Sequence, residues 1–311
     1  AATFADPHGV AVTSDGSTLY VVEKAGYRSR VRRIILSSTV VTSIAGCISS
    51  WGCGSESDGT GVDATFNDLR AIVISPNDET LYVADNKAIR QVVIATGVVT
   101  TIAGHLNWMS YPLYDGVGSD ARFYKPAGMA LSSDGTIIYV GAMGDSSMSD
   151  NRIRRLVIST TAVTTLAGTQ SFHYQPIDAT GTSARFYGPR GLALSSDGTQ
   201  IYVADGLNHL IRTVTIATTA VTTFSGSTQG EADGVASAAQ FNGPFGVAMS
   251  TGGDALYVAS DGNCRIRRVR TCMTCTHKRL GFCADSCVKI AWRISGGNRA
   301  GSTAPAPRAS T

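Results

Sequence analysis

The sequence has 311 residues, and its formal net charge of +3 is far from the strongly basic balance of a dedicated nucleic-acid-binding protein. It contains no run of about eighteen uninterrupted apolar residues, so no membrane-spanning helix is predicted. With 43% hydrophobic and 16% charged residues, it is typical of a folded protein rich in strands and turns. The chain begins at Ala1 without Met or a signal peptide, which indicates a processed, trimmed or partial chain.

Five copies of one repeat follow one another along the chain. Each copy begins with a phenylalanine, a short turn and an apolar run, as in FADPHGVAVTSDGSTLYV and FYGPRGLALSSDGTQIYV. The spacings between successive copies are 62, 57, 63 and 55 residues, and the leading residues are Phe4, Phe66, Phe123, Phe186 and Phe241. Self-similarity at such a period predicts a repeat architecture in which neighbouring units bury one another.

Each copy is predicted to form four short strands. In the third copy these are Gly128 to Leu131, Ile137 to Val140, a charged segment from Arg152 to Ile158, and Ala162 to Leu166. An Asp-Gly pair between the first two strands indicates a tight hairpin. Four antiparallel strands per repeat are typical of a propeller blade, so the fold class is an all-β propeller.

From Phe4 to about Arg270 the repeats resemble the NHL family. The fourth copy matches best, in the segments that begin at Phe186, Tyr202, Asn208 and Val221. The resemblance implies a propeller and says little about activity. Members of the family usually have six blades, and five copies are visible here, so a five-bladed and a six-bladed ring both stay open.

The predicted domains are a propeller over residues 1–270, a Cys-rich segment over 271–294 and a disordered tail over 295–311. The fifth copy lacks the VTTLAG segment that ends the others. Residues Val288 to Ile294 alternate apolar and polar side chains and are a candidate for this missing outer strand. The alternative is that a further blade lies outside the chain.

Seven cysteines indicate the cellular compartment. Cys47 and Cys53 flank one inter-blade loop, and their separation suits a disulfide. Four more, Cys272, Cys275, Cys283 and Cys287, lie in a segment with almost no core of its own. We expect disulfides there and keep a structural zinc site as the alternative. These expectations favour an extracellular or lumenal, secreted protein.

The mouth of the central channel is the first place to look for a site. The middle residue of the Pro-x-Gly motif at the start of each first strand, which reads Leu-Arg-Ala in the second copy, should face it. These residues are His8, Arg70, Ala127, Arg190 and Phe245. A catalytic zinc needs three protein ligands and calcium needs oxygen ligands, so one histidine and two arginines predict neither a metal nor a cofactor. No catalytic residue is assigned, and a metal-dependent hydrolase or lyase of the lactonase or amidating-lyase propeller type is the alternative, with His8 and the strand-end acids.

Two recurring charge patterns have a structural interpretation. Glu23, Asp85 and Asp205 end the second strands, and we expect the two aspartates to pair with Arg90 and Arg212. Three arginines in the pattern R-x-R-R recur in three of the third strands, from Arg30 to Arg33, Arg152 to Arg155 and Arg265 to Arg268. RNA binding is the second alternative, but nearby acids almost balance these arginines, so a nucleic-acid partner is not favoured.

The loops between blades carry exposed aromatic residues, which are favoured anchors for a partner. They are Trp51, Trp108, Tyr111, Tyr114, Phe172 and Tyr174. The leading hypothesis is a non-catalytic extracellular scaffold that binds a protein or glycan partner through the loop face and the channel mouth. Membership of a larger chain or assembly stays open.

Overall fold

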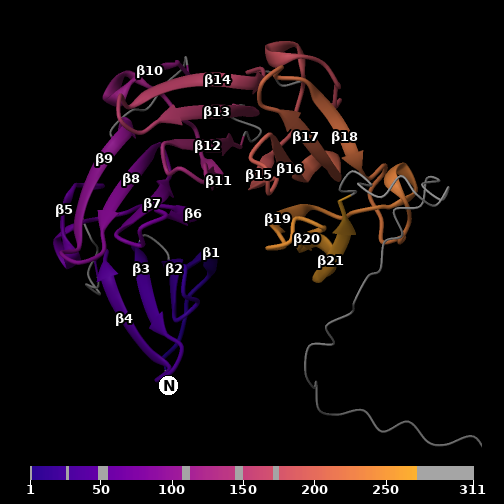
Figure 1. Ribbon diagram of the computed structural model, residues 1–311. Helices are drawn as coiled ribbons and strands as arrows, with labels where there is room; N and C mark the ends of the chain where they lie inside the picture. The colour runs from indigo at the N-terminus through magenta and orange to yellow at the C-terminus, as the bar shows by residue number, and fades with distance from the viewer. Residues whose placement is uncertain are drawn as a thin grey trace, which may run out of the picture.

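The computed structural model describes residues 2–25, 28–47, 55–106, 113–143, 150–170 and 175–271, and these form an all-β protein. Five antiparallel sheets, called blades 1 to 5 in chain order, stand around a common axis in a propeller arrangement (Figure 1). Each of the five sequence repeats therefore forms one blade, as predicted. In the described residues, helical structure is limited to single turns of 3-10 helix in the connections: η1 (Gly61–Asp63), η2 (Gly118–Asp120), η3 (Gly181–Ser183), η4 (Gly206–Asn208), η5 (Ala236–Ala238) and η6 (Asp261–Asn263).

Within each blade the strands run outward from the axis in chain order, and in blades 2 and 3 a two-residue strand joins the outer edge. Among the described residues blade 5 has three strands. The strands are, in blade 1, β1 (Pro7–Val12), β2 (Thr18–Ala25), β3 (Arg28–Ile35) and β4 (Val40–Ala45); in blade 2, β5 (Gly59–Thr60), β6 (Leu69–Ile74), β7 (Thr80–Asp85), β8 (Ala88–Val93) and β9 (Val98–Gly104); in blade 3, β10 (Gly116–Val117), β11 (Pro126–Leu131), β12 (Ile137–Ala142), β13 (Arg152–Val157) and β14 (Ala162–Gly168); in blade 4, β15 (Pro189–Leu194), β16 (Gln200–Asp205), β17 (Leu210–Thr215) and β18 (Val221–Ser225); and in blade 5, β19 (Pro244–Met249), β20 (Ala255–Ser260) and β21 (Arg265–Arg270).

The turn between β11 and β12 explains why each repeat makes a hairpin. Oδ1 of Asp134 accepts hydrogen bonds from the Thr136 amide at 3.0 Å and from the Ser132 hydroxyl at 2.5 Å. The Gly135 amide donates to the Ser132 carbonyl at 2.8 Å, and its φ of 72° lies in the left-handed region that glycine adopts without steric cost. The corresponding turn of blade 4 repeats these contacts. The Asp-Gly signal in the sequence is therefore confirmed as a hairpin turn.

A β-bulge interrupts the innermost strand of every blade near its start. In blade 1, Pro7 lies opposite Glu23 while Gly9 lies opposite Val22, so His8 is the extra residue of the bulge. The same shift occurs in β6, β11, β15 and β19. A bulge turns the side chain of its extra residue out of the regular alternation of the strand. The residues affected in this way include the five that the sequence analysis placed at the channel mouth.

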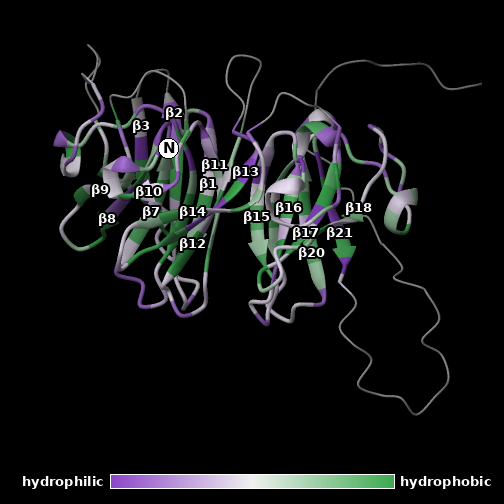
Figure 2. Cartoon of the chain, turned by 90° about the horizontal axis from the view of Figure 1, so that it is seen from above, coloured by the Kyte–Doolittle hydropathy of each residue, from purple (hydrophilic) through white to green (hydrophobic). Residues whose placement is uncertain are grey.

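Neighbouring blades bury one another through two different faces. The forward face, which looks toward the next blade in the chain, carries Tyr, Ala and Ile side chains, and the backward face carries Phe, Leu, Ile and Val. Between blades 2 and 3, for example, Tyr82 and Ile89 of the forward face pack with Phe123, Met129 and Ile138 of the backward face. The other three contacts between successive blades repeat this pattern. Figure 2 shows the hydrophobic residues concentrated in the strands and hydrophilic ones in the connections.

Glycine in the innermost strand allows the closest of these approaches. A Cβ on Gly128 of β11 would lie 1.5 Å from the carbonyl oxygen of Arg190 in β15. A Cβ on Gly191 would lie 2.5 Å from the carbonyl oxygen of Phe245 in β19. The Pro-x-Gly motif therefore serves the packing of one innermost strand against the next, as well as the bulge.

Several sequence predictions fall outside the described residues. They concern the loop residues Trp51, Trp108, Tyr111, Phe172 and Tyr174, the cysteines Cys53, Cys272, Cys275, Cys283 and Cys287, the candidate strand Val288 to Ile294, and the tail. These stay predictions. In the part of the chain that is described, no helix is long and apolar enough to cross a membrane.

Candidate functional site

The bulged residues of neighbouring blades meet at the mouth of the channel. The guanidinium carbon of Arg190 stacks 5.2 Å from the centre of the Phe245 ring, and the rings of His8 and Phe245 have centres 6.3 Å apart. Arg70 is close enough to Arg190 for its positive charge to act on the pKa of that side chain. Residues of blades 1, 2, 4 and 5 therefore meet in one place, although they are far apart in the sequence.

Two of the three basic side chains at the mouth have an acid two residues earlier. His8 Nε2 lies 3.2 Å from an Asp6 carboxylate oxygen. Arg70 donates two hydrogen bonds to Oδ2 of Asp68, from Nε at 2.8 Å and Nη2 at 2.6 Å, and Lys24 binds the other oxygen of that carboxylate at 2.9 Å. Pairing with these bases outweighs partial burial and lowers the pKa of Asp68.

Arg190 has no such partner. The position two residues before it holds Gly188 in place of an acid. Among the described residues its side chain has no hydrogen-bond acceptor and no ion pair, and its Nε is buried without an acceptor. Burial lowers the pKa of Arg190, an effect that the nearby Asp261 opposes. A partly buried guanidinium that stacks on an aromatic ring and has unused donors is well suited to bind an anionic group.

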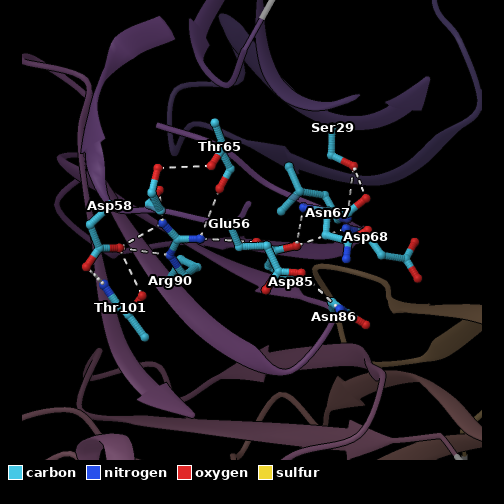
Figure 3. Close-up of polar contacts among 12 residues, drawn as sticks. Ser29, Glu56, Asp58, Thr65, Asn67, Asp68, Asp85, Asn86, Arg90 and Thr101 are labelled. Carbon is cyan, nitrogen blue, oxygen red and sulfur yellow. Dashed lines mark hydrogen bonds and ion pairs between the residues drawn. The ribbon is translucent and has the colours of Figure 1, made fainter. Parts of the chain in front are cut away.

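The acids that end the second strands are part of the interior. In blade 2 (Figure 3) Arg90 is fully buried, and its guanidinium lies between Oδ2 of Asp85 at 3.1 Å and Oδ1 of Asp58 at 2.7 Å. It also stacks on the leading phenylalanine, with its guanidinium carbon 5.1 Å from the centre of the Phe66 ring. Oδ1 of Asp85 accepts hydrogen bonds from two backbone amides, those of Asn67 and Asp68. The predicted structural role of Asp85 is confirmed.

Other blades repeat this arrangement with their own residues. In blade 4, Arg212 pairs with Asp205 at 3.0 Å and with Asp178, and it donates to the carbonyl oxygens of Ile177 and Arg185. Equivalent arginines stack on the leading phenylalanine in every blade and are Arg32, Arg90, Arg154, Arg212 and Arg267. The arginine of the third strand therefore binds the connection that precedes the first strand of the same blade and holds it in place.

No family model matches the sequence. NHL repeat-containing protein 2 of Bos taurus is 31% identical over 150 residues, which are 46% of this chain and 20% of that protein. Protein SUPPRESSOR OF QUENCHING 1, chloroplastic, of Arabidopsis thaliana is 26% identical over 279 residues, 86% of this chain and 25% of that protein. The chain is a β-propeller whose repeats are similar to those of NHL repeat-containing proteins. It spans a quarter or less of the length of these two relatives.

Solved structures support the propeller fold. An auxiliary nutrient binding protein from Bacteroides thetaiotaomicron superposes with a TM-score of 0.64 at 17% identity, over 86% of this chain and 60% of that one. A chain of a nidogen/laminin complex superposes with a TM-score of 0.54 at 13% identity, over 85% and 75% of the two chains. At such identities the likeness concerns the fold alone.

The first two arginines of each R-x-R-R motif in the third strands have a structural role in the propeller. The third-strand residues Arg32, Arg154 and Arg267 are buried between blades. Their neighbours Arg30, Arg152 and Arg265 pair with Glu23, Asp150 and Glu231. Six of the nine arginines of these motifs are thus occupied within the fold, which weakens the RNA-binding alternative.

The hydrolase alternative depends on His8 and the strand-end acids. Glu23, Asp85 and Asp205 have no solvent exposure, and each is held by an arginine, while His8 lies near Asp6. In the described ranges no three His, Cys, Asp or Glu side chains are grouped so as to hold a metal ion. The acids that prompted this alternative therefore lie inside the blades, out of reach of a substrate in the channel.

The buried aspartates Asp85 and Asp205 make the stability of the protein depend on pH, because each shares its arginine with a second carboxylate. Burial raises the pKa of Asp85 and of Asp205 from 3.8 to about 6, and Arg90 and Arg212 offset this effect only partly. A carboxyl with a higher pKa in the folded state favours folding when it is protonated. The contribution of both groups to stability is therefore present below pH 4 and lost as the pH rises through 6.

We expect chemical denaturation monitored by circular dichroism to show this loss between about pH 4 and 7. In Asp205→Asn the loss should be smaller, because one of the two groups no longer titrates. An unfolding midpoint that rises steadily over the same range would contradict the prediction.

Two further predicted residues lie in the described part of the loops. The Tyr114 side chain is exposed, and the Tyr114 carbonyl accepts a hydrogen bond from Nη2 of Arg154 at 2.6 Å, which fixes the backbone there. Cys47 is disulfide-bonded. Its expected partner, Cys53, is not described, so that pairing stays a prediction. Cys264 is free and exposed.

The sequence also carries a signal for Arg190 that the bulged residues alone do not show. The repeat alignment shows Asp6, Asp68, Lys125, Gly188 and Gly243 at one position, two residues before the bulged residue. When each bulged residue is compared with the residue two positions before it, Arg190 is the one arginine of the ring that has no acid there.

Proposed function

We propose that the chain is a non-catalytic binding scaffold that uses the loop face around the channel mouth to bind a protein or glycan partner. The partner contributes an anionic group, such as a carboxylate, that binds Arg190. The observation that carries the proposal is the unpaired guanidinium of Arg190, stacked on Phe245 in a ring whose other basic residues already have acids.

The surroundings of Arg190 support this choice of ligand. The Phe245 ring shields one face of the guanidinium from water, which strengthens its interaction with an anion. Arg70 adds positive charge that Asp68 offsets. Exposed Tyr114 lies in the inter-blade connection of blade 3, where an aromatic side chain can contact a partner. A shared fold with a protein named for nutrient binding is consistent with a binding role.

Binding of carboxylate-bearing probes to the immobilised chain tests the proposal. We expect a panel of acidic peptides and uronic acid oligosaccharides to contain binders, and neutral analogues of those binders to fail. Arg190→Gln should weaken binding about tenfold or more, since a hydrogen bond to a charged group contributes about 1.5–3 kcal/mol.

Arg268→Gln is the matched control. Arg268 belongs to the third strand of blade 5 and pairs with an exposed acid, Asp254, away from the mouth. Equal binding by the parent chain and Arg190→Gln would exclude the mouth as the site. Failure of every anionic probe to bind would count against the ligand class.

We also propose that the protein is secreted, since a disulfide at Cys47 suits an oxidising compartment. Protein isolated from the culture medium that has the native mass and keeps the disulfide at Cys47 would support secretion. A reduced Cys47 in natively produced protein would argue against it.

A further inference from the structure

In blades 1 to 4 the buried arginine of the third strand binds a carboxylate that has no solvent exposure. The arginine makes this contact through Nη1, and the acid ends the second strand or lies shortly before the third. The pairs are Arg32 with Glu23 at 2.7 Å, Arg90 with Asp85 at 3.1 Å, Arg154 with Asp150 at 3.7 Å and Arg212 with Asp205 at 3.0 Å. A buried anionic group beside the arginine is therefore a repeated part of the blade.

Blade 3 keeps this anionic group although its second strand does not supply one. Ala142 stands at the place that Asp205 has in blade 4, opposite the first residue of the innermost strand. Asp150, two residues before the third strand, provides the carboxylate that faces Arg154. The negative charge is thus preserved in blade 3 while the residue that carries it changes.

Blade 5 has the buried arginine without such an acid. Ser260 stands at the place of Asp205, opposite the first residue of the innermost strand, and is 3% exposed. Arg267, which is 5% exposed, donates from Nη2 to Asp233 and from Nη1 to the Gln240 carbonyl. Among the described residues no second carboxylate pairs with this guanidinium.

Two polar side chains at this position of blade 5 are buried and have no hydrogen-bond partner in the described part of the chain. The atoms concerned are the Ser260 hydroxyl and both polar atoms of the Asn263 amide. In blade 4 the equivalent Asn208 donates from Nδ2 to Oδ2 of Asp205 at 2.8 Å. Asn263 is therefore placed to donate to an acceptor where Asp205 has its carboxylate. Because a buried donor without an acceptor costs free energy, the position favours an acceptor.

The backbone offers a further donor at the same position. In blade 4 the Tyr187 amide, directly after the leading phenylalanine, donates to Oδ1 of Asp205 at 2.7 Å. Asn242 holds the same place after Phe241 in blade 5. Hydroxyl, side-chain amide, backbone amide and guanidinium donors around one point suit an anion, because each can donate to it.

We propose that blade 5 binds a small monovalent anion, chloride or formate, between Ser260, Asn263 and Arg267. The anion takes the place that the carboxylate of Asp205 has in blade 4.

Charge and burial define this class of ligand. Arg212 of blade 4 pairs with two carboxylates, Asp205 and Asp178, whereas Arg267 of blade 5 pairs with Asp233 alone. One further negative charge gives blade 5 the same balance, and a divalent anion would exceed it. Since Ser260 and Arg267 are buried, the ion must also be small, about the size of the carboxylate that it replaces.

Thermal unfolding at constant ionic strength tests the site. Sodium gluconate, whose anion is far larger than a carboxylate group, is replaced stepwise by sodium chloride or, separately, by sodium formate. An ion that binds only the folded protein raises its melting temperature. We expect a rise of about 2–4 °C when the ion reaches ten times its Kd. The ion that acts at the lower concentration is the preferred ligand.

Ser260→Asp supplies in blade 5 the carboxylate that blade 4 has at Asp205. Its melting temperature in gluconate should reach that of the parent in saturating chloride, and neither chloride nor formate should raise it further. Ser260→Ala removes one donor and should need several-fold more of the ion for the same rise. Arg190→Gln should respond as the parent does, which separates this site from the one proposed at the channel mouth.

Anomalous diffraction from crystals grown in sodium bromide locates the ion directly. We expect a bromide within hydrogen-bond reach of Arg267 Nη1 and Ser260 Oγ in the parent. In Ser260→Asp the same position should hold the new carboxylate. A water molecule at this position in the parent crystals would overturn the proposal.

Two outcomes of the unfolding experiment would also overturn it. One is a response of Ser260→Asp equal to that of the parent, because the ion would then bind elsewhere. The other is a parent whose melting temperature neither anion changes. If Asp285→Asn then gains a response, the occupant is Asp285, the one acidic side chain of residues 272–311, which lies outside the described residues.

Discussion

Arg212→Met is expected to lower the free energy of unfolding by about 3–5 kcal/mol, the usual effect of removing one partner of a buried ion pair. Methionine keeps most of the volume of the side chain and its contact with Phe186 but has no charge and no donors. Asp205 would then be fully buried without its counter-ion, and the carbonyl oxygens of Ile177 and Arg185 would lose their donor. Urea denaturation followed by circular dichroism measures the change.

Arg268→Met provides the comparison at the surface. Arg268 pairs with Asp254, whose side chain is exposed, and solvent screens such a pair. We expect little change in the unfolding midpoint for this variant. If the free energy of unfolding falls equally in both methionine variants, the buried arginines do not stabilise the blades in the way that their contacts indicate.

Gly128→Ala is expected to lower the free energy of unfolding by about 1–3 kcal/mol, the usual range for adding volume to a packed interior. The added methyl group would overlap the carbonyl oxygen of Arg190, so strands β11 and β15 would have to separate. Because the overlap is with backbone atoms, no rotamer change can relieve it. The separation would also move Arg190, so we expect weaker binding of anionic probes in the same variant.

Gly246→Ala is the matched control for this prediction. The residue occupies the same place in the repeat, and its nearest contact would be 3.7 Å, an ordinary van der Waals distance. Thermal unfolding should place Gly246→Ala close to the parent and Gly128→Ala clearly below it. Equal melting temperatures for the two variants would show that the innermost strands are not packed as tightly as described.

Much of the fold is determined locally and was accessible from the sequence. The turn at Asp134 and Gly135 depends on hydrogen bonds within five residues, and the apolar runs around it depend on side-chain type. Repetition of such a unit predicts a propeller, because a single sheet cannot cover its own faces. The pairing of Asp85 with Arg90 was predictable for the same reason, since five residues separate them.

The tertiary structure alone decided which arginines are buried and which aromatic rings they stack on. Arg32 and Arg30 look equivalent in the sequence, yet only contact with a neighbouring segment determines which of them is buried. The sequence shows that no acid lies two residues before Arg190, but only the assembled ring shows its guanidinium stacked on Phe245. The physical reason is distance along the chain. Phe4 lies 28 positions from Arg32 and Phe245 lies 55 positions from Arg190, and no local pattern reports which surfaces the fold brings together.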